Sequence, residues 1–441
     1  MVVEKNTGNN QLRKGRSTKL QGMQCKGFHI LAKPIGPTCN MNCGYCFYSE
    51  KATFFAEKSS LRMNDSVLES FISKYIRSQD IPEISFVWQG GEPTLLGLDY
   101  FNKVISFQKK YADGKRITNS LQTNGTLLNA EWCRFLKAHD FLVGLSIDGP
   151  EMIHDHYRVY QSGRPTFYKV LHGLSLLQKY GVNFNVLACV TKESSQYPLE
   201  IYSFFKQAGV QFIQFSPIVE RIPNDSDRES GLRHAAPPIL DLEEKQTKVT
   251  SYSVEAEAYG DFLIQIFDEW VKKDVGRIYV MNFEWALQSW IGLPSTYCFF
   301  ARQCGRALAI EHNGDIYACD HYVYPDYRLG NIVTDEPKEI VDSALQVEFG
   351  RQKEATLPLK CRECEVLFAC NGECAKHRFL ITADNEPGLN YLCSGYKKYF
   401  RYIHPYMKGM KELIENDLPA DRIMKIGERE WKRKNHENKV N

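Results

Sequence analysis

The sequence has no continuous run of about 18 apolar residues, the length that a transmembrane helix requires. Its first 27 residues are basic in part but lack the apolar stretch of a secretory signal. An excess of one charge is also missing, because 55 Lys and Arg stand against 53 Asp and Glu, and the net charge is +2. This balance argues against nucleic acid or an anionic membrane as a partner. We therefore expect a cytoplasmic protein that binds neither.

Cysteine, by contrast, is plentiful, with 14 residues in the chain. A reducing compartment disfavours disulfides, so clustered cysteines predict metal ligands or catalytic groups. Cys39, Cys43 and Cys46 have the spacing C-x3-C-x2-C. Three thiolates can hold a cuboidal 4Fe–4S cluster and leave one iron without a protein ligand. From this triplet alone, a zinc knuckle with a remote fourth ligand and three unrelated cysteines stay open as alternatives.

A second group of cysteines crowds the last third of the chain. Its members are Cys298, Cys304, Cys319, Cys361, Cys364, Cys370, Cys374 and Cys393. Eight thiolates suffice for two clusters with four ligands each, although C-x2-C pairs also occur in zinc ribbons. Beside a redox-type triplet, iron is the favoured metal. Cys133 and Cys189 stand apart in a helical and a strand pattern, which predicts buried small hydrophobic residues.

Apolar strand-like runs alternate with amphipathic helical stretches from Phe28 onward. The runs are 28–32, 84–88, 117–122, 141–147, 184–190 and 212–217. The stretches with helical spacing are 65–77, 100–111, 130–139, 167–180 and 198–208. This alternation predicts an α/β fold with βαβ units and a parallel sheet. Six units correspond to a partial (β/α)6 barrel or an open doubly wound sheet, and both place the active site at the carboxyl ends of the strands.

The same patterns predict five segments. They are a mobile tail (1–27), an α/β core (28–255), a helical linker (256–297), a cysteine-rich domain (298–400) and a C-terminal helix and tail (401–441). Within them, residues 220–255 are polar and rich in turn residues, which predicts a long surface loop. Helices are expected over 256–273, 278–291 and 399–415.

Glycines and small polar residues follow the second, third and fourth predicted strands. The segments are 88–94 (WQGGEPT), 122–125 (QTNG) and 146–150 (SIDGP). Paired glycines let the backbone approach a ligand closely, although each segment alone is also compatible with a simple turn. As a set at one edge of the sheet, they predict a site for a polar ligand.

The C-x3-C-x2-C triplet followed by GGEP after the next strand resembles the radical S-adenosylmethionine (SAM) superfamily. In that family the open iron binds SAM, and reductive cleavage gives a 5′-deoxyadenosyl radical that takes hydrogen from the substrate. The resemblance implies that Cys39, Cys43 and Cys46 ligate this cluster. It implies SAM contacts by Tyr45 and Val219 at the adenine, Gly91 at the methionine amino group, Ser146 at the ribose and Arg158 at the carboxylate.

The later cysteines resemble the SPASM domain, which holds two auxiliary 4Fe–4S clusters in radical SAM enzymes that modify peptides. The interleaved ligation of that family implies a first ligand set of Cys298, Cys304, Cys319 and Cys374. The second ligand set that it implies is Cys361, Cys364, Cys370 and Cys393. The two resemblances together imply a radical SAM barrel over 28–255, a SPASM domain over 298–400, and three 4Fe–4S clusters with SAM as cofactors.

Within this group, residues 28–406 most closely resemble the anaerobic sulfatase-maturating enzymes, above all in 313–325 (NGDIYACDHYVYP), WQGGEPTLLGL and LQTNGTLLN. Those enzymes oxidise an active-site Cys or Ser of a sulfatase to Cα-formylglycine. The resemblance implies that Asp320 is the base, with a pKa raised by a neighbouring anionic cluster, and that His321 is the runner-up. It also implies two partners, an unfolded or nascent sulfatase and a reducing electron donor such as flavodoxin or ferredoxin.

Two other functions stay open at this point. One is a SPASM-type radical SAM maturase of another ribosomal peptide, forming a thioether or a crosslink; the lack of a peptide-recognition segment before Phe28 counts against it. The other is a non-enzymatic module that holds zinc or clusters for structure or electron transfer. The sequence also leaves open whether the target is of the Cys type or the Ser type.

Overall fold

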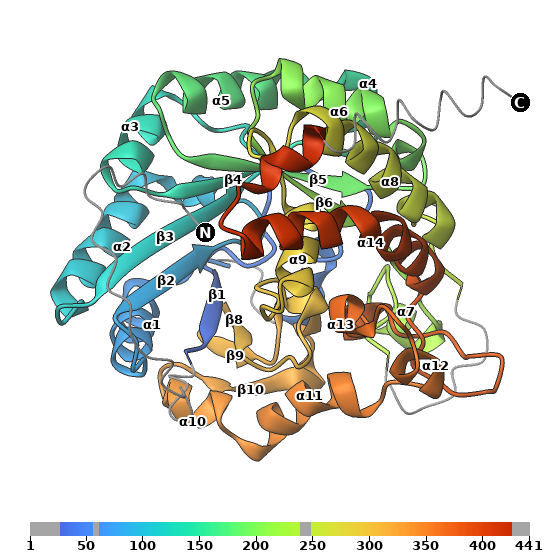
Figure 1. Ribbon diagram of the computed structural model, residues 1–441. Helices are drawn as coiled ribbons and strands as arrows, with labels where there is room; N and C mark the ends of the chain where they lie inside the picture. Colours follow the sequence, from blue (N-terminus) through green and yellow to red (C-terminus); the bar gives the residue numbers. More distant parts are fainter. Residues whose placement is uncertain (1–26, 56–60, 239–247, 426–441) are drawn as a thin grey trace, which may run out of the picture.

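The structure is a computed structural model that describes residues 27–55, 61–238 and 248–425 (Figure 1). The tail expected over 1–27 therefore lies almost wholly outside the described residues, and so does the charged end after residue 425. None of the described helices combines the length and the apolar character needed to cross a bilayer.

Six parallel strands form the centre of the fold. They are β1 (His29–Lys33), β2 (Glu83–Trp88), β3 (Arg116–Thr123), β4 (Leu142–Ser146), β5 (Phe184–Val190) and β6 (Phe212–Pro217). Their order in the sheet follows their order in the chain, and every neighbouring pair is parallel. A doubly wound sheet reverses this order at a switch point, whereas a barrel does not. The predicted partial barrel is thus confirmed.

Six helices cover the outside of these strands (Figure 1). They are α1 (Asp65–Arg77), α2 (Gly97–Tyr111), α3 (Ala130–Ala138), α4 (Glu151–Tyr157), α5 (Phe167–Lys179) and α6 (Pro198–Gln207). Two of these helices begin with a side-chain cap. The Asn64 side chain accepts a hydrogen bond from the N–H of Val67 at the start of α1, and the Asn129 side chain accepts one from the N–H of Trp132 at the start of α3. Their apolar faces pack on the strands, so the barrel wall forms one continuous core.

Three short strands of the cysteine-rich region extend the sheet beyond β1. They are β8 (Ala307–Glu311), β9 (Asp315–Tyr317) and β10 (Arg328–Asn331). Strand β8 lies parallel to β1, with Glu311 opposite Lys33, and β9 and β10 continue the sheet in antiparallel pairs. The cysteine-rich region is thereby joined to the first strand of the barrel by backbone hydrogen bonds.

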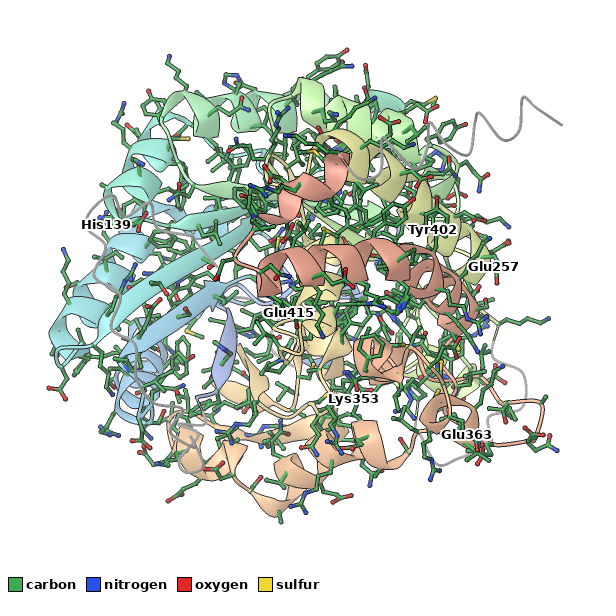
Figure 2. All side chains as sticks on the ribbon, viewed as in Figure 1. His139, Glu257, Lys353, Glu363, Tyr402 and Glu415 are labelled. Carbon is green, nitrogen blue, oxygen red and sulfur yellow. The ribbon has the colours of Figure 1, made fainter. Side chains whose placement is uncertain are left out.

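The remaining helices surround this extension and the last strand. They are α7 (Asp225–Glu229), α8 (Ala256–Lys273), α9 (Met281–Trp290), α10 (Pro337–Val341), α11 (Ala344–Ala355), α12 (Leu359–Arg362), α13 (Leu367–Cys370) and α14 (Cys393–Glu415). Glu257 and Tyr402 mark the side of the molecule where α8 and α14 lie against each other (Figure 2).

Two expectations need correction. The helix expected over 278–291 begins with a two-residue strand, β7 (Tyr279–Val280), which pairs with β6 and ends the sheet. The final helix starts at Cys393 rather than Tyr399. The described part of 220–255 is exposed at many positions, as expected of a surface segment, but it contains the helix α7 and is anchored by buried Glu220 and His234, the latter 3.2 Å from the carboxylate of Glu50. Residues 239–247 of that segment lie outside the described residues.

Candidate active site

The triplet cysteines lie in the irregular loop that follows β1. The Cys39 thiol accepts a hydrogen bond from the N–H of Met41 at 3.4 Å, and the N–H of Cys46 donates to the Cys43 carbonyl at 3.0 Å. Burial raises the pKa of the Cys39 thiol to about 11, and the pKa of Cys43 is raised further. The three sulfur atoms are near enough to influence one another electrostatically. Iron binds thiolates, so cluster assembly here must release protons.

The GGEP segment after β2 is fastened directly to this cysteine loop. The N–H of Gly91 donates to the Gly36 carbonyl at 2.8 Å, and the N–H of Glu92 donates to the Thr38 carbonyl at 2.9 Å. A Cβ atom at Gly91 would lie 1.9 Å from the Thr38 carbonyl oxygen. Only glycine permits this approach, so Gly91 fixes the position of its own backbone beside the loop.

A buried cluster of side chains joins the loop to the end of β4. Asp148 accepts a hydrogen bond from the Tyr45 hydroxyl and another from the N–H of Cys189 at 3.0 Å. Arg158 pairs with Asp148 at 2.9 Å between Nε and Oδ1, and its guanidinium lies 5.6 Å from the centre of the Tyr45 ring. Two of the predicted SAM contacts, Tyr45 and Arg158, are thus brought together by Asp148, a residue that was not predicted as part of the site.

The other predicted SAM contacts lie at the ends of β4 and β6. Ser146 accepts a hydrogen bond from Gln122 at 2.9 Å, so the ends of two strands are tied together. Val219 follows β6 and is buried. Asn124 was also missed: its amide contacts the Cys39 sulfur at 3.8 Å and donates to Asn40 at 2.9 Å. Both Asp148 and Asn124 stand in strand-end segments quoted from the sequence, which was the available signal.

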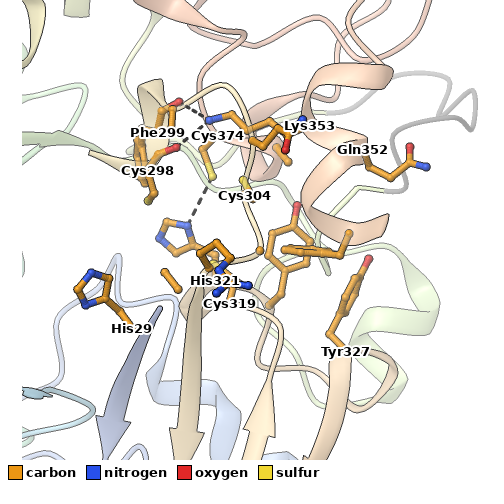
Figure 3. A pocket seen from close by; sticks show the side chains of 18 of the residues that line it. His29, Cys298, Phe299, Cys304, Cys319, His321, Tyr327, Gln352, Lys353 and Cys374 are labelled. Atoms are coloured by element: carbon orange, nitrogen blue, oxygen red, sulfur yellow. Dashed lines mark hydrogen bonds between the residues drawn. The ribbon is translucent and has the colours of Figure 1, made fainter. Parts of the chain in front are cut away.

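The structure gathers four of the later thiols around one cavity of about 430 Å³ (Figure 3). They are Cys298, Cys304, Cys319 and Cys374. Burial raises the pKa of Cys298 to about 11 and those of the other three in the same direction. The ammonium of Lys353 donates to the carbonyls of Cys298 and Phe299, both at 2.7 Å, at the wall of this cavity. A buried cation is well suited to a site that collects thiolate charge.

The other four thiols form a separate group. Cys361, Cys364, Cys370 and Cys393 influence one another electrostatically, and burial raises the pKa of Cys361 to about 11. Buried Arg378 acts on thiols of both groups and donates to the carbonyls of Gly388 at 2.8 Å and Lys353 at 2.6 Å. The later cysteines thus lie in two groups, and the assignment of each group to one cluster stays a prediction. Among the described residues, no three His, Cys, Asp or Glu side chains could hold a single metal ion.

Asp320 begins the short helix η5 (Asp320–Tyr322), one residue after Cys319. Its carboxylate pairs with the ammonium of Lys33 at 2.6 Å. Burial is the strongest single influence and acts to raise the pKa of Asp320, but Lys33, His321 and Lys376 together hold that pKa below its usual value. The expected rise of this pKa depends on an anionic cluster beside the carboxylate and stays a prediction, while the buried lysine, which acts in the opposite direction, was not apparent from the sequence.

His321, the runner-up base, faces the same cavity (Figure 3). Its Nδ1 lies 3.7 Å from the Cys374 sulfur, and its ring meets the edge of Phe47 at 5.2 Å between centroids. Burial lowers the pKa of His321 to about 3, and Lys376 acts in the same direction. The pKa of Asp320 is lowered as well, so pKa does not separate the two candidates, and Asp320 stays the predicted base on the family resemblance alone.

Comparison with known families defines the class of protein. Residues 34–205 match the radical SAM superfamily, and residues 298–365 match an iron–sulfur cluster-binding domain, SPASM. The protein is thus a radical SAM enzyme whose cofactors are iron–sulfur clusters and SAM.

Similar proteins narrow this class. The chain is 47% identical to a serine-type anaerobic sulfatase-maturating enzyme of Bacteroides thetaiotaomicron, over 91% of this chain and 95% of the relative. It is 34% identical to a cysteine-type anaerobic sulfatase-maturating enzyme of Clostridium perfringens, over 85% and 96%. A solved structure, anSMEcpe with bound AdoMet and the Cp18Cys peptide, superposes with a TM-score of 0.76 at 32% identity and covers 88% of this chain and 99% of that one. The chain belongs to the family of anaerobic sulfatase-maturating enzymes.

Proposed function

We propose that this protein oxidises a serine or cysteine side chain of a sulfatase polypeptide to Cα-formylglycine without oxygen. The observation that carries the proposal is the 47% identity to a serine-type maturating enzyme over 91% of the chain. A partly exposed base candidate, Asp320, next to one group of thiols agrees with it. The other radical SAM maturase function, crosslinking of a ribosomal peptide, has weaker support, since Streptococcus suis SuiB, solved with the precursor peptide SuiA, is only 14% identical to this chain and supports the fold alone.

The target that we propose first is serine. The serine-type relatives of Bacteroides thetaiotaomicron and Klebsiella aerogenes are 47% and 37% identical to this chain, each over 91% of it. The cysteine-type relative of Clostridium perfringens is 34% identical over 85%. A seryl target has a weakly acidic hydroxyl, so its oxidation needs a base placed to receive that proton.

The first cluster would be held by Cys39, Cys43 and Cys46, which leaves one iron open for SAM. Once bound, the cluster and SAM supply the radical that removes a hydrogen atom from the substrate Cβ. The other SAM contacts would be Tyr45 and Val219 at the adenine, Gly91 at the amino group, Ser146 at the ribose and Arg158 at the carboxylate. Because a guanidinium carries five N–H donors, pairing of Arg158 Nε with Asp148 still leaves donors for a carboxylate.

The two later sets of cysteines would each hold one auxiliary cluster. The sets are Cys298, Cys304, Cys319 and Cys374, and Cys361, Cys364, Cys370 and Cys393. We propose that a cluster held by the set beside Asp320 would take up the electron left after hydrogen and proton removal, and that a flavodoxin or ferredoxin would supply electrons to the first cluster. We place the enzyme in the cytoplasm, because all cysteines among the described residues are free thiols.

Asp320 would accept the hydroxyl or thiol proton of the substrate. Its side chain is 24% exposed, whereas that of its partner Lys33 is 1% exposed, so the carboxylate has an open side and a buried side. The ammonium of Lys33 neutralises the charge of the ionised carboxylate on its buried side, where water does not reach it well. The base is thereby held ready in its proton-accepting form.

Anaerobic incubation with SAM, a reductant and two peptides tests the proposal. One peptide carries S-x-A-x-R and the other carries C-x-P-x-R, and mass spectrometry measures both. The serine peptide should lose the mass of two hydrogen atoms, and 5′-deoxyadenosine should accumulate. Unchanged masses of both peptides, in protein with about 12 irons per chain and a working reductant, would contradict the proposed reaction.

A further inference from the structure

Lys33 is the last residue of β1 and is fully buried. Strand β1 has parallel neighbours on both sides, β2 and β8, so Lys33 ends an interior strand of the sheet. Its carbonyl accepts a hydrogen bond from the N–H of Gly36 at 3.0 Å, at the point where the strand gives way to the cysteine loop. The backbone of Lys33 is thus fixed by its neighbours, and only its side chain reaches into the site.

The ammonium of Lys33 contacts one residue from each of two cysteine regions. It pairs with Asp320 at 2.6 Å and lies 3.7 Å from the centre of the Tyr48 ring. Tyr48 stands two residues after Cys46, and Asp320 stands one residue after Cys319. An ammonium removed from water without a partner costs several kcal/mol, so both partners are held firmly against it. One buried charge therefore sets how Tyr48 and Asp320 sit relative to each other.

Tyr48 is itself locked in place by the strand next to β1. Its hydroxyl donates to the carboxylate of Glu311, which is buried and lies directly opposite Lys33 in the pairing of β1 with β8. Lys33, Tyr48 and Glu311 thus form a chain of contacts that starts and ends on adjacent strands. Such a network resists movement, because shifting any one member leaves a buried charge or polar group without its partner.

We propose that Lys33 is a positioning residue for the reaction, which holds the carboxylate of Asp320 at the place where it receives the substrate proton. The inference rests on the proposed role of Asp320. Lys33 itself touches neither substrate nor cofactor in this role. Because Lys33 is fixed on β1, it holds Asp320 at a constant position relative to the cysteine loop that follows β1. The removal of a hydrogen atom from the substrate Cβ and of the proton from the hydroxyl or thiol on that carbon can thereby occur at one bound substrate.

The proposal predicts what each replacement of Lys33 does. Methionine keeps most of the length of the side chain but removes the charge, so Asp320 loses its anchor while the apolar stem still packs. Arginine keeps the charge but spreads it over a planar fork that presents its donors differently, so it restores function in part. We expect Lys33→Met to lower kcat at least about tenfold with peptide KM within about twofold, because a misplaced catalytic group costs rate rather than affinity.

The test uses fully reconstituted enzyme with all clusters, and compares wild type, Lys33→Met and Lys33→Arg. The measurements are kcat, peptide KM, and the amount of 5′-deoxyadenosine formed per formylglycine. Lys33→Met should form several molecules of 5′-deoxyadenosine per product, since SAM is still cleaved while the base is out of place. Lys33→Arg should lie between Lys33→Met and wild type in both kcat and this ratio. A general loss of folding would not give this graded separation of SAM cleavage from product.

Lys206→Met is the matched control. Lys206 pairs with Asp274 at the same 2.6 Å, but the pair links α6 to the end of α8. Its loss should leave the ratio of 5′-deoxyadenosine to formylglycine unchanged. Wild-type kcat and ratio in Lys33→Met would overturn the proposed role of Lys33 alone. Failure of wild-type enzyme to make formylglycine would instead contradict the proposed function, and the two failures are thus distinct.

Discussion

The carboxylate of Glu92 accepts a hydrogen bond from the backbone N–H of Asn124 at 2.7 Å, which ties the segment after β2 to the segment after β3. Its other oxygen accepts from the Thr94 N–H at 3.0 Å and from the Thr123 hydroxyl at 2.7 Å. Glu92 is fully buried, and burial raises its pKa although these hydrogen bonds act in the opposite direction. The glutamate of GGEP is therefore used inside the protein, to hold two loops of the site together.

Replacing Glu92 by Gln should destabilise the protein by about 3 kcal/mol, because an amide nitrogen would face a buried N–H or hydroxyl donor. The expected result is a lower melting temperature and poor iron incorporation at the cysteine loop. Differential scanning fluorimetry and iron analysis measure both. Glu83→Gln, at the exposed start of β2, is the control and should change neither. Normal stability in Glu92→Gln would show that the two loops do not depend on this carboxylate.

Replacing Gly91 by Ala should prevent SAM from binding in the normal way. The new Cβ would lie 1.9 Å from the Thr38 carbonyl oxygen, and backbone cannot move aside as a flexible side chain can. We expect a cost of at least about 3 kcal/mol and a weaker affinity for SAM, measured by equilibrium binding to the reconstituted protein. Gly97→Ala has open space around it and a φ of +78°, so it should cost only about 1 kcal/mol and leave SAM affinity unchanged. Equal SAM affinity in both variants would contradict the expected effect of a Cβ atom at Gly91 on SAM binding.

The barrel was predictable because its signals are local. Strands such as β5 are nearly continuous apolar runs, and α1 and α8 have the same bounds as the ranges expected from helical spacing. The strands β8 to β10 were not predicted, since each has three to five residues and their pairing with β1 joins segments far apart in the chain. For the same reason Lys33 was not predicted. Its partner Asp320 was predicted, because it stands in a sequence motif. Contacts between distant segments leave no periodic signal in one sequence.

Replacing Asp320 by Asn should slow formylglycine formation by a factor of about 100 or more, because the amide does not accept a proton. The shape of the side chain is kept, so all clusters should assemble and SAM should still be cleaved. Anaerobic assays of formylglycine, 5′-deoxyadenosine and iron content measure these three properties together. Asp326→Asn, on the exposed surface of the same region, is the matched control. Wild-type turnover in Asp320→Asn would rule out Asp320 as the base.

Glu284 on α9 should make stability depend on pH. Burial raises the pKa of its carboxyl from 4.5 to about 7. Between these two values the folded protein keeps a proton that the unfolded chain has lost, so stability falls as the pH rises through this window, by about 3 kcal/mol in all. Glu284→Gln removes this loss: the variant should match wild type near pH 5 and melt a few degrees higher near pH 8. Thermal unfolding at both pH values measures the difference.

Glu363→Gln, on the surface near the second group of thiols (Figure 2), should show no such gain. If Glu284→Gln were less stable than wild type at pH 8, the ionised carboxylate would have a partner whose attraction exceeds the free energy lost on burying the charge.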